Sequence, residues 1–264
     1  MVNRVAWTRQ QLLVAFSLYC KIPFGKLHQK NPEIISYAAL IGRTPSALAM
    51  KLTNIASLDP AITATGRKGL KGTSKADRQM WEEMQNDWDR FVAQSENAIH
   101  EVQSNFSTEK NIIADEQNSL AEQQDYTEEN KVVSSKTRVG QDFFRRAVLS
   151  AYDNKCCITG LSVRQLLVAS HIVPWRVDTK NRLNPRNGLS LSMLHDKAFD
   201  SGLITIDGDM KVCVSTRISI SENDNFFISA LRDYHGQPIF QPKKFLPHEN
   251  FLIYHRENIF EKLF

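Results

Sequence analysis

Residues 168–207 place the tightest limits on how this chain folds. They read VASHIVPWRVDTKNRLNPRNGLSLSMLHDKAFDSGLITID. Two histidines, His171 and His195, and a central Asn187-Gly188 pair stand among short apolar runs. The apolar run that ends at Pro174 is of β type, because short runs bounded by turn residues favour strands. This stretch therefore predicts short strands joined by polar turns.

The residues on either side of this run predict a mixture of helix and strand. Residues 137–156 are expected to form a helix with Phe144, Val148 and Tyr152 on one face. A strand followed by a turn is expected at CCITG (156–160), and a helix at residues 188–199. The alternating apolar residues of GLITIDGDMKVCVS (202–215) predict a hairpin around an Asp-Gly turn.

The N-terminal third is expected to be helical. Thr8 is a suitable N-cap for a first helix, and Pro23 ends it. A second helix, a turn at Gly42 and a third helix that starts at Thr44 and Pro45 follow. This order is the outline of a helix-turn-helix, and an ordinary helical hairpin is the alternative.

A helix-turn-helix would place several polar side chains of this region on the DNA side. The loop TGRKGLKGTSK (65–75) that follows has glycines and basic residues suited to phosphate contacts, or it is simply a solvated loop. The expected DNA contacts of this region are Arg43, Ser46, Lys51, Asn54, Arg67, Lys68 and Lys71.

Charge is distributed unevenly along the chain. The net charge is +4, yet residues 94–130 contain nine acidic residues and one lysine. Residues 1–93 carry 13 basic and 7 acidic residues, and residues 131–264 carry 19 and 13. Two basic modules joined by an acidic connector suit a polyanion such as nucleic acid. We expect a helical domain at 1–93, a connector at 94–134 and a further domain at 135–264. The connector is expected to be either a solvated helix or a partly disordered linker.

Several classes of protein are disfavoured. No apolar run approaches the roughly 20 residues that span a bilayer. The first residues lack the features of a secretory signal. The four cysteines form no CxxC pair, and Cys156 and Cys157 are adjacent, so neither a disulfide framework nor a four-cysteine zinc site is expected. These features indicate a cytoplasmic protein with reduced thiols.

Four ordered motifs identify a resemblance. They are Cys157-Ile-Thr-Gly160, Ser170-His171-Ile172-x-Pro174-Trp175, Asn184-x-x-Asn187-Gly188-Leu189 and Leu194-His195-x-x-x-Phe199-Asp200-x-Gly202. Together they resemble the HNH nuclease family, and in particular the branch at the C-terminus of bacterial restriction endonucleases. The resemblance covers roughly residues 138–207 and extends into the tail. It implies an α+β fold in which a two-stranded hairpin packs on a helix, the ββα-metal element.

The resemblance also implies roles for the motif residues. His171 corresponds to the general base, Asn187 to the asparagine that fixes the loop backbone, and His195 to a metal ligand. A divalent cation, Mg²⁺ or Mn²⁺, would neutralise charge on the phosphate. Many family members place a metal ligand just before the base, where this chain has Ser170, a poor ligand for a hard cation. Asp200 is the preferred second ligand, with Asp196 behind it, although Asp200 can instead cap the helix end.

The expected function is a restriction-type DNA endonuclease acting on double-stranded DNA. A homodimer is expected, because one HNH site hydrolyses one strand. Either a separate methyltransferase protects the host or the enzyme cuts only modified DNA. The alternatives are a DNA-binding regulator with a degenerate HNH domain and a nuclease toxin. Further phosphate contacts are expected from Arg138, Gln141, Arg145, Arg146, Lys155, Arg176 and Arg186.

Overall fold

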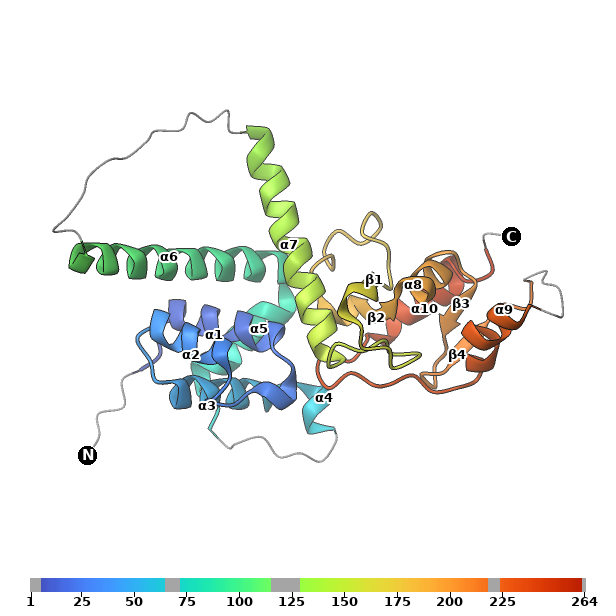
Figure 1. The fold of residues 1–264 in the computed structure, drawn as a ribbon, viewed down its shortest axis with the longest axis horizontal. Helices are drawn as coiled ribbons and strands as arrows, with labels where there is room; N and C mark the ends of the chain where they lie inside the picture. Colours follow the sequence, from blue (N-terminus) through green and yellow to red (C-terminus); the bar gives the residue numbers. More distant parts are fainter. Residues whose placement is uncertain (1–5, 65–71, 115–128, 218–223, 263–264) are drawn as a thin grey trace. The chain divides into compact units, whose positions relative to one another are not determined.

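The computed structural model describes residues 6–64, 72–114, 129–217 and 224–262 (Figure 1). Helices and two small antiparallel sheets make up these residues, which confirms the predicted α+β class. Among them, no helix is both long and apolar enough to cross a membrane. All four cysteines are free thiols, as expected.

The chain divides into two compact units. The first consists of Met1–Leu58 and Lys68–Phe143, and the second of Asp59–Arg67 and Phe144–Phe264. Helix α7 (Glu129–Ala151) continues through the boundary between them. The two units are described separately below.

Helices make up the first unit. Their bounds are α1 Arg9–Lys21, η1 (a 3₁₀ turn) Phe24–Lys26, α2 Pro32–Leu40, α3 Pro45–Ala56, α5 Lys75–Asn86 and α6 Trp88–Ala114. The predicted helix starts are confirmed, because the Thr8 hydroxyl accepts from the Gln11 amide and the Thr44 hydroxyl accepts from the Ala47 amide, both at 3.2 Å. Gly42 has φ +64°, the left-handed conformation that the turn between α2 and α3 requires.

The core of the first unit is centred on α1. This helix packs against α3 and α6, and nearly all of its residues from Leu12 onward are buried. Residues 94–114, from the acidic stretch, form most of α6, and Ser95, Ala98, Ile99 and Val102 are buried there. A helix in this stretch can thus contribute apolar side chains to a core while its acidic residues stay at the surface.

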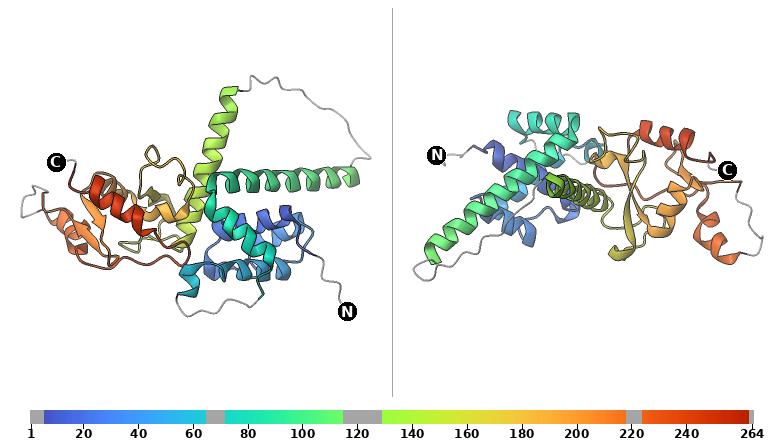
Figure 2. Two further views of the ribbon diagram at one scale, coloured as in Figure 1. Left: turned by 180° about the vertical axis from the view of Figure 1, so that it is seen from behind. Right: turned by 90° about the horizontal axis from the view of Figure 1, so that it is seen from above.

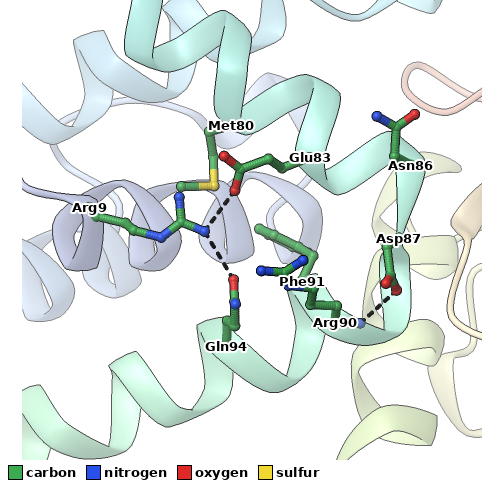
Figure 3. Close-up of a pocket in the computed structure, with 8 residues that line it drawn as sticks. All are labelled: Arg9, Met80, Glu83, Asn86, Asp87, Arg90, Phe91 and Gln94. Atoms are coloured by element: carbon green, nitrogen blue, oxygen red, sulfur yellow. Dashed lines mark hydrogen bonds and ion pairs between the residues drawn. The ribbon is translucent and has the colours of Figure 1, made fainter.

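A pocket of about 540 Å³ opens where α5 meets α6 (Figure 3). Arg9 crosses it and donates to Glu83 at 2.7 Å and to Gln94 at 3.1 Å. Asp87, at the bend between the helices, accepts from the Arg90 amide at 2.9 Å. Arg9 and Glu83 in the lining are therefore paired with each other, and none of the residues predicted for catalysis lines the pocket.

The second unit contains both sheets. Its elements are α4 Pro60–Thr63, the end of α7, η2 Arg164–Leu166, β1 Leu167–His171, η3 Pro185–Asn187, β2 Gly188–Ser192, α8 Met193–Asp200, β3 Ile204–Ile206, β4 Val212–Val214, α9 Asn225–Ala230, η4 Arg232–Tyr234 and α10 Glu249–Asn258. Strands β1 and β2 pair antiparallel, with Leu167 opposite Ser192 and His171 opposite Gly188. Helix α8 follows β2 directly and packs on both strands (Figures 1 and 2).

Two predicted elements of this unit were wrong. Residues 188–192 form β2, and the helix begins only at Met193, where Ser192 caps it. All five residues of β2 are buried, and its sequence, GLSLS, does alternate apolar and polar residues as strands do, so this signal in the sequence was overlooked. CCITG forms turns and no strand. The hairpin predicted after residue 202 is confirmed as β3 and β4.

Helix α10 packs on β3 through a buried histidine. His255 is 0% exposed; its Nδ1 lies 2.8 Å from the Thr205 hydroxyl and its Nε2 lies 3.1 Å from the Phe199 carbonyl. The ring also stacks on Phe199, with centroids 3.6 Å apart. Burial lowers the pKa of His255 to about 4. This histidine therefore stays neutral and structural at neutral pH.

We expect the protein to lose stability in mild acid because of His255. The unfolded chain binds a proton near pH 6.5, whereas the folded chain binds it only near pH 4. Stability is thus complete above pH 6.5 and decreases as the pH falls towards 4, by about 2 to 3 kcal/mol at pH 4.5. Urea unfolding at pH 7.5 and 4.5 measures this loss. The variant His255→Gln, which cannot titrate, should lose correspondingly less, and an equal loss in both proteins would contradict the assignment.

Candidate active site

His171 stands at the end of β1 with one ring nitrogen held by the backbone. Its Nε2 lies 2.9 Å from the carbonyl oxygen of Arg182. A carbonyl can only accept a hydrogen bond, so Nε2 must carry the proton when the ring is neutral. Nδ1 then carries the lone pair. The backbone therefore selects the tautomer in which Nδ1 can accept a proton.

Two aromatic rings fix the plane of His171. Phe144, from α7, stacks on it with centroids 3.9 Å apart and an interplanar angle of 7°. Trp175 meets it edge to face at 5.5 Å and 87°. Burial lowers the pKa of His171, while the Arg182 carbonyl and the Asp196 carboxylate partly offset this. The imidazole is thus held neutral, in one orientation, at neutral pH.

Asn187 ties the strand end to the loop that follows. It is 0% exposed, and its Oδ1 accepts from the Val173 amide at 2.8 Å while its Nδ2 donates to the Val173 carbonyl at 3.1 Å. Its own carbonyl accepts from the Ile172 amide at 3.0 Å. The two residues that follow His171 are thereby fixed. This geometry matches the role that the resemblance implies for Asn187.

Gly188 lies opposite His171 and makes room for α7. A Cβ at this position would lie 2.4 Å from Cγ2 of Val148 and 2.9 Å from Cζ of Phe144. Phe144 is also the ring that stacks on His171. The absence of a side chain at position 188 therefore allows the packing that orients the imidazole.

We expect Gly188→Ala to lower both stability and any activity that depends on His171. The added methyl group overfills the contact with α7, which costs about 1 to 3 kcal/mol. It also displaces Phe144 from the imidazole. Thermal unfolding measures the first effect, and the pH titration of His171 by NMR measures the second. Adding Val148→Ala should restore part of both losses, and no restoration would contradict this explanation.

Helix α8 carries the acidic residues next to His171. Asp196 and Asp200 are four residues apart and share a face of the helix. Partial desolvation of the Asp200 carboxyl group and repulsion by Asp196 raise the pKa of Asp200 to about 6, although the residue as a whole is exposed. Asp196 also interacts electrostatically with His171. Asp196 thus acts electrostatically on both His171 and Asp200.

His195 faces another side of α8. It is 3% exposed, and its Nδ1 lies 2.7 Å from the Ser192 hydroxyl. Its Nε2 is buried and makes no hydrogen bond of good geometry among the described residues, although the Ala230 carbonyl is close enough to act on the ring. The Tyr234 ring meets the imidazole edge to face at 5.6 Å. Burial lowers the pKa of His195, and the Ala230 carbonyl partly offsets this. The structure therefore separates His195 from Asp200, the two ligands expected from sequence.

The donor set on α8 fits a hard divalent cation. Mg²⁺ is usually held by one or two carboxylates, with water and phosphate oxygens completing its shell. A cation would relieve the repulsion between Asp196 and Asp200. Within the described ranges, no group of three or more His, Cys, Asp or Glu side chains could hold a metal by itself.

Ser170 does not face this site. Successive side chains of a strand point to opposite faces, so Ser170 and His171 diverge. Ser170 is 2% exposed, and its hydroxyl has no hydrogen-bond partner in the described part of the chain. The neutral residue before the base is therefore part of the core.

The cations predicted to contact DNA from the first unit are partly engaged within the protein. Lys51 is 7% exposed and donates to both carboxylate oxygens of Asp77, at 2.8 and 3.0 Å. Arg43 donates to the Ala6 carbonyl and to Gln11. These contacts argue against Lys51 as a phosphate contact. Asn54 is also buried, whereas Ser46 is exposed. Arg67, Lys68 and Lys71 lie outside the described residues.

The predicted contacts around α7 and the sheet differ in accessibility. Arg145 is half-buried and donates to the Leu167 carbonyl at 2.8 Å, and Arg186 donates to the Leu246 carbonyl at 3.0 Å. Both are thus engaged in the fold. Arg146 is half-buried. Exposed positions are occupied by Arg138, Gln141, Lys155 and Arg176.

Three contributors to this site were missed in the sequence. They are the stacking ring of Phe144, the edge of Trp175 and the carbonyl of Arg182. Phe144 was predicted only as part of an apolar helix face, and Trp175 only as part of a motif. A backbone carbonyl leaves no signal in the amino-acid sequence.

Comparison with known protein families agrees with this geometry. Residues 156–207 match a family described as HNH endonuclease. This range contains β1, β2, α8 and β3, with His171, Asn187 and His195. No curated protein of significantly similar sequence was found. Members of this family generally use a divalent metal, and the match supports nuclease activity, that is, hydrolysis of phosphodiester bonds. Residues 156–207 of this chain are thus similar to an HNH endonuclease domain.

Proposed function

We propose that this protein is a metal-dependent DNA endonuclease of restriction type in which His171 is the general base. The observation that carries the proposal is the geometry of His171, whose Nε2–H is held by the Arg182 carbonyl while Nδ1 presents a lone pair. Two rings and the Asn187 contacts hold that geometry. A group oriented in this way is suited to remove a proton from water.

The reaction follows from these positions. Nδ1 of His171 accepts a proton from the water that attacks the phosphorus, the bond to the 3′-oxygen breaks, and the leaving 3′-oxygen takes a proton from solvent water. A divalent cation, when bound, would neutralise charge on the phosphate and on the leaving oxygen. Asp196 and Asp200 would hold it, since they supply hard oxygen ligands beside His171. His195, implied as a ligand by the family resemblance, keeps a buried Nε2 that makes no hydrogen bond of good geometry among the described residues, which leaves that nitrogen as a further candidate ligand.

Recognition of the target belongs in this proposal to the first unit. Its helices α2 and α3 are joined by a tight turn, the arrangement of a helix-turn-helix. In this proposal Ser46 on α3 and Arg138 on α7, which are both exposed, contact the DNA. Cutting both strands requires two sites, so we propose a homodimer. A separate methyltransferase, or a requirement for modified bases, would protect the host DNA.

The test is cleavage of phage genomes that carry unmodified, methylated or hydroxymethylated bases. Purified protein is incubated with each in Mg²⁺, Mn²⁺ or EDTA. Discrete fragments in Mg²⁺ or Mn²⁺ and none in EDTA are expected, and the genome that is cut identifies the modification requirement. Random degradation would favour a nuclease toxin. Tight DNA binding without cleavage on any substrate would overturn the proposal in favour of a DNA-binding regulator.

A further inference from the structure

The loop between β1 and β2 contains four Asp or Asn side chains spaced three residues apart. They are Asp178, Asn181, Asn184 and Asn187, and we call them the Asx network. Asp178 accepts from the Asn181 side chain at 2.7 Å and from its backbone amide at 3.2 Å. Asn181 in turn accepts from the Asn184 side chain at 3.0 Å. Each member therefore fixes the next one.

The Asx network continues to the asparagine of the HNH motif. The Asn184 carbonyl accepts from the Asn187 amide at 2.9 Å, and the Asn181 carbonyl accepts from the Asn187 side chain at 3.4 Å. Asn184 and Asn187 are buried. A chain of hydrogen bonds thus runs from the partly exposed Asp178 to the core of the domain.

Arg182 lies inside this network and completes the contact with the base. Its neighbour Asn181 is fixed by Asp178 on one side and Asn184 on the other. Its guanidinium donates to the Trp175 carbonyl at 2.9 Å and lies 5.2 Å from the Trp175 ring centroid. The Arg182 carbonyl, held in this way, meets Nε2 of His171 at 2.9 Å.

We propose that Asp178 and Asn181 are positioning residues for the nuclease reaction, which hold the Arg182 carbonyl against His171 so that the base presents Nδ1 to water. The inference rests on the proposed function, because it assigns these residues to the base of that reaction. Neither residue touches the substrate phosphate in this role. They act through the loop backbone, as groups that orient a catalytic histidine do.

A swap of the two side chains tests the contact directly. In Asp178→Asn, Oδ1 still accepts from the Lys180 and Asn181 backbone amides, so the new NH2 group faces the side-chain NH2 of Asn181 and the 2.7 Å hydrogen bond is lost. Asn181→Asp places a carboxylate against the Asp178 carboxylate and loses the same hydrogen bond. The double variant Asp178→Asn/Asn181→Asp restores a donor and an acceptor with unchanged net charge. The matched control is Asp207→Asn, which makes the same substitution in another turn. Asp207 also accepts from two backbone amides, those of Asp209 and Lys211, but it lies in the β3–β4 hairpin, outside the Asx network.

The cleavage readout separates positioning from stability. We expect each single variant to lower kcat about tenfold, a part of the ~10²–10⁴-fold that a general base contributes, with little change in KM. The double variant should recover most of kcat, as coupled residues do in such a cycle. The contact with the Arg182 carbonyl raises the pKa of His171, so its loss should lower that pKa and move the acidic limb of the pH–rate profile to lower pH. Asp196, the charged group that acts on His171, is unchanged in all variants.

An NMR readout does not depend on activity. In ¹⁵N-labelled protein, the imidazole of His171 should be protonated at Nε2 alone in the wild type, the double variant and the control. Each single variant should show exchange between the two tautomers. If the wild type cuts no DNA while the tautomers behave as expected, the proposed function fails and the positioning role stands.

The opposite results overturn the inference. Single variants with the wild-type tautomer and wild-type kcat would show that the Asx network does not act on His171. Single variants that lose activity only in proportion to a lost folded fraction, with the pH profile unshifted, would show a purely structural loop. Failure of the double variant to recover would exclude the contact between the two side chains as the cause.

Discussion

Replacing His171 by alanine is expected to lower the rate of DNA cleavage at saturating substrate by about 10²–10⁴-fold, the usual contribution of a general base. Binding of DNA should persist, because His171 is held by the Arg182 carbonyl and two rings of its own unit. Cleavage and gel-shift assays on the same DNA measure the two quantities. Added imidazole should restore part of the rate, since it can occupy the space beside Phe144.

The pH dependence of the wild-type enzyme provides a second measure of His171. Burial lowers the pKa of this residue below its ordinary value of 6.5, so the rate should fall only at a pH below that value. The matched control is His235→Ala, which removes an exposed ring that accepts from the Val214 amide. A variant His171→Ala that cuts at the wild-type rate would exclude His171 as the base.

Replacing Gly202 by alanine is expected to destabilise the second unit by about 2 to 5 kcal/mol. Gly202 has φ +67°, a conformation that costs other residues about 1 to 2 kcal/mol. A Cβ would also lie 2.3 Å from the carbonyl oxygen of Ile259. A backbone carbonyl cannot rotate away as a side chain can, so the segment after α10 must move. Overpacking of this kind costs about 1 to 3 kcal/mol more. Thermal and urea unfolding measure the sum.

Two other glycines of the same unit separate these contributions. Gly236 has φ +74° with nothing within 4 Å of an added Cβ, so Gly236→Ala tests the backbone conformation alone. Gly208 has neither constraint, so Gly208→Ala should be nearly neutral. We expect the loss of stability to increase from Gly208 to Gly236 to Gly202. Equal losses at Gly236 and Gly202 would show that the contact with Ile259 has no cost.

The sequence predicts best where the interactions are local. Thr8 and Thr44 each cap a helix by accepting from an amide three residues later, so their position alone marks the helix start. The Asp-Gly turn predicts the hairpin of β3 and β4 for the same reason. The four ordered motifs also pointed to the HNH family, and residues 156–207, which contain them, match a family described as HNH endonuclease.

Pairings between distant residues could not be predicted in this way. Residues 188–192 were predicted as the start of a helix, and only their antiparallel pairing with β1 identifies them as strand β2. Lys51 was predicted to contact DNA, but in the folded protein its ammonium group donates to the Asp77 carboxylate.

By itself, then, the sequence determined the α+β class, the helix caps of the first unit and the motif residues His171, Asn187 and His195. Only the tertiary structure decided that the Arg182 carbonyl selects the tautomer of His171, and that Asp196 acts electrostatically on both His171 and Asp200. The physical reason is that the direction of a side chain depends on helix phase and on contacts made across the fold, and neither is encoded in the residue type alone.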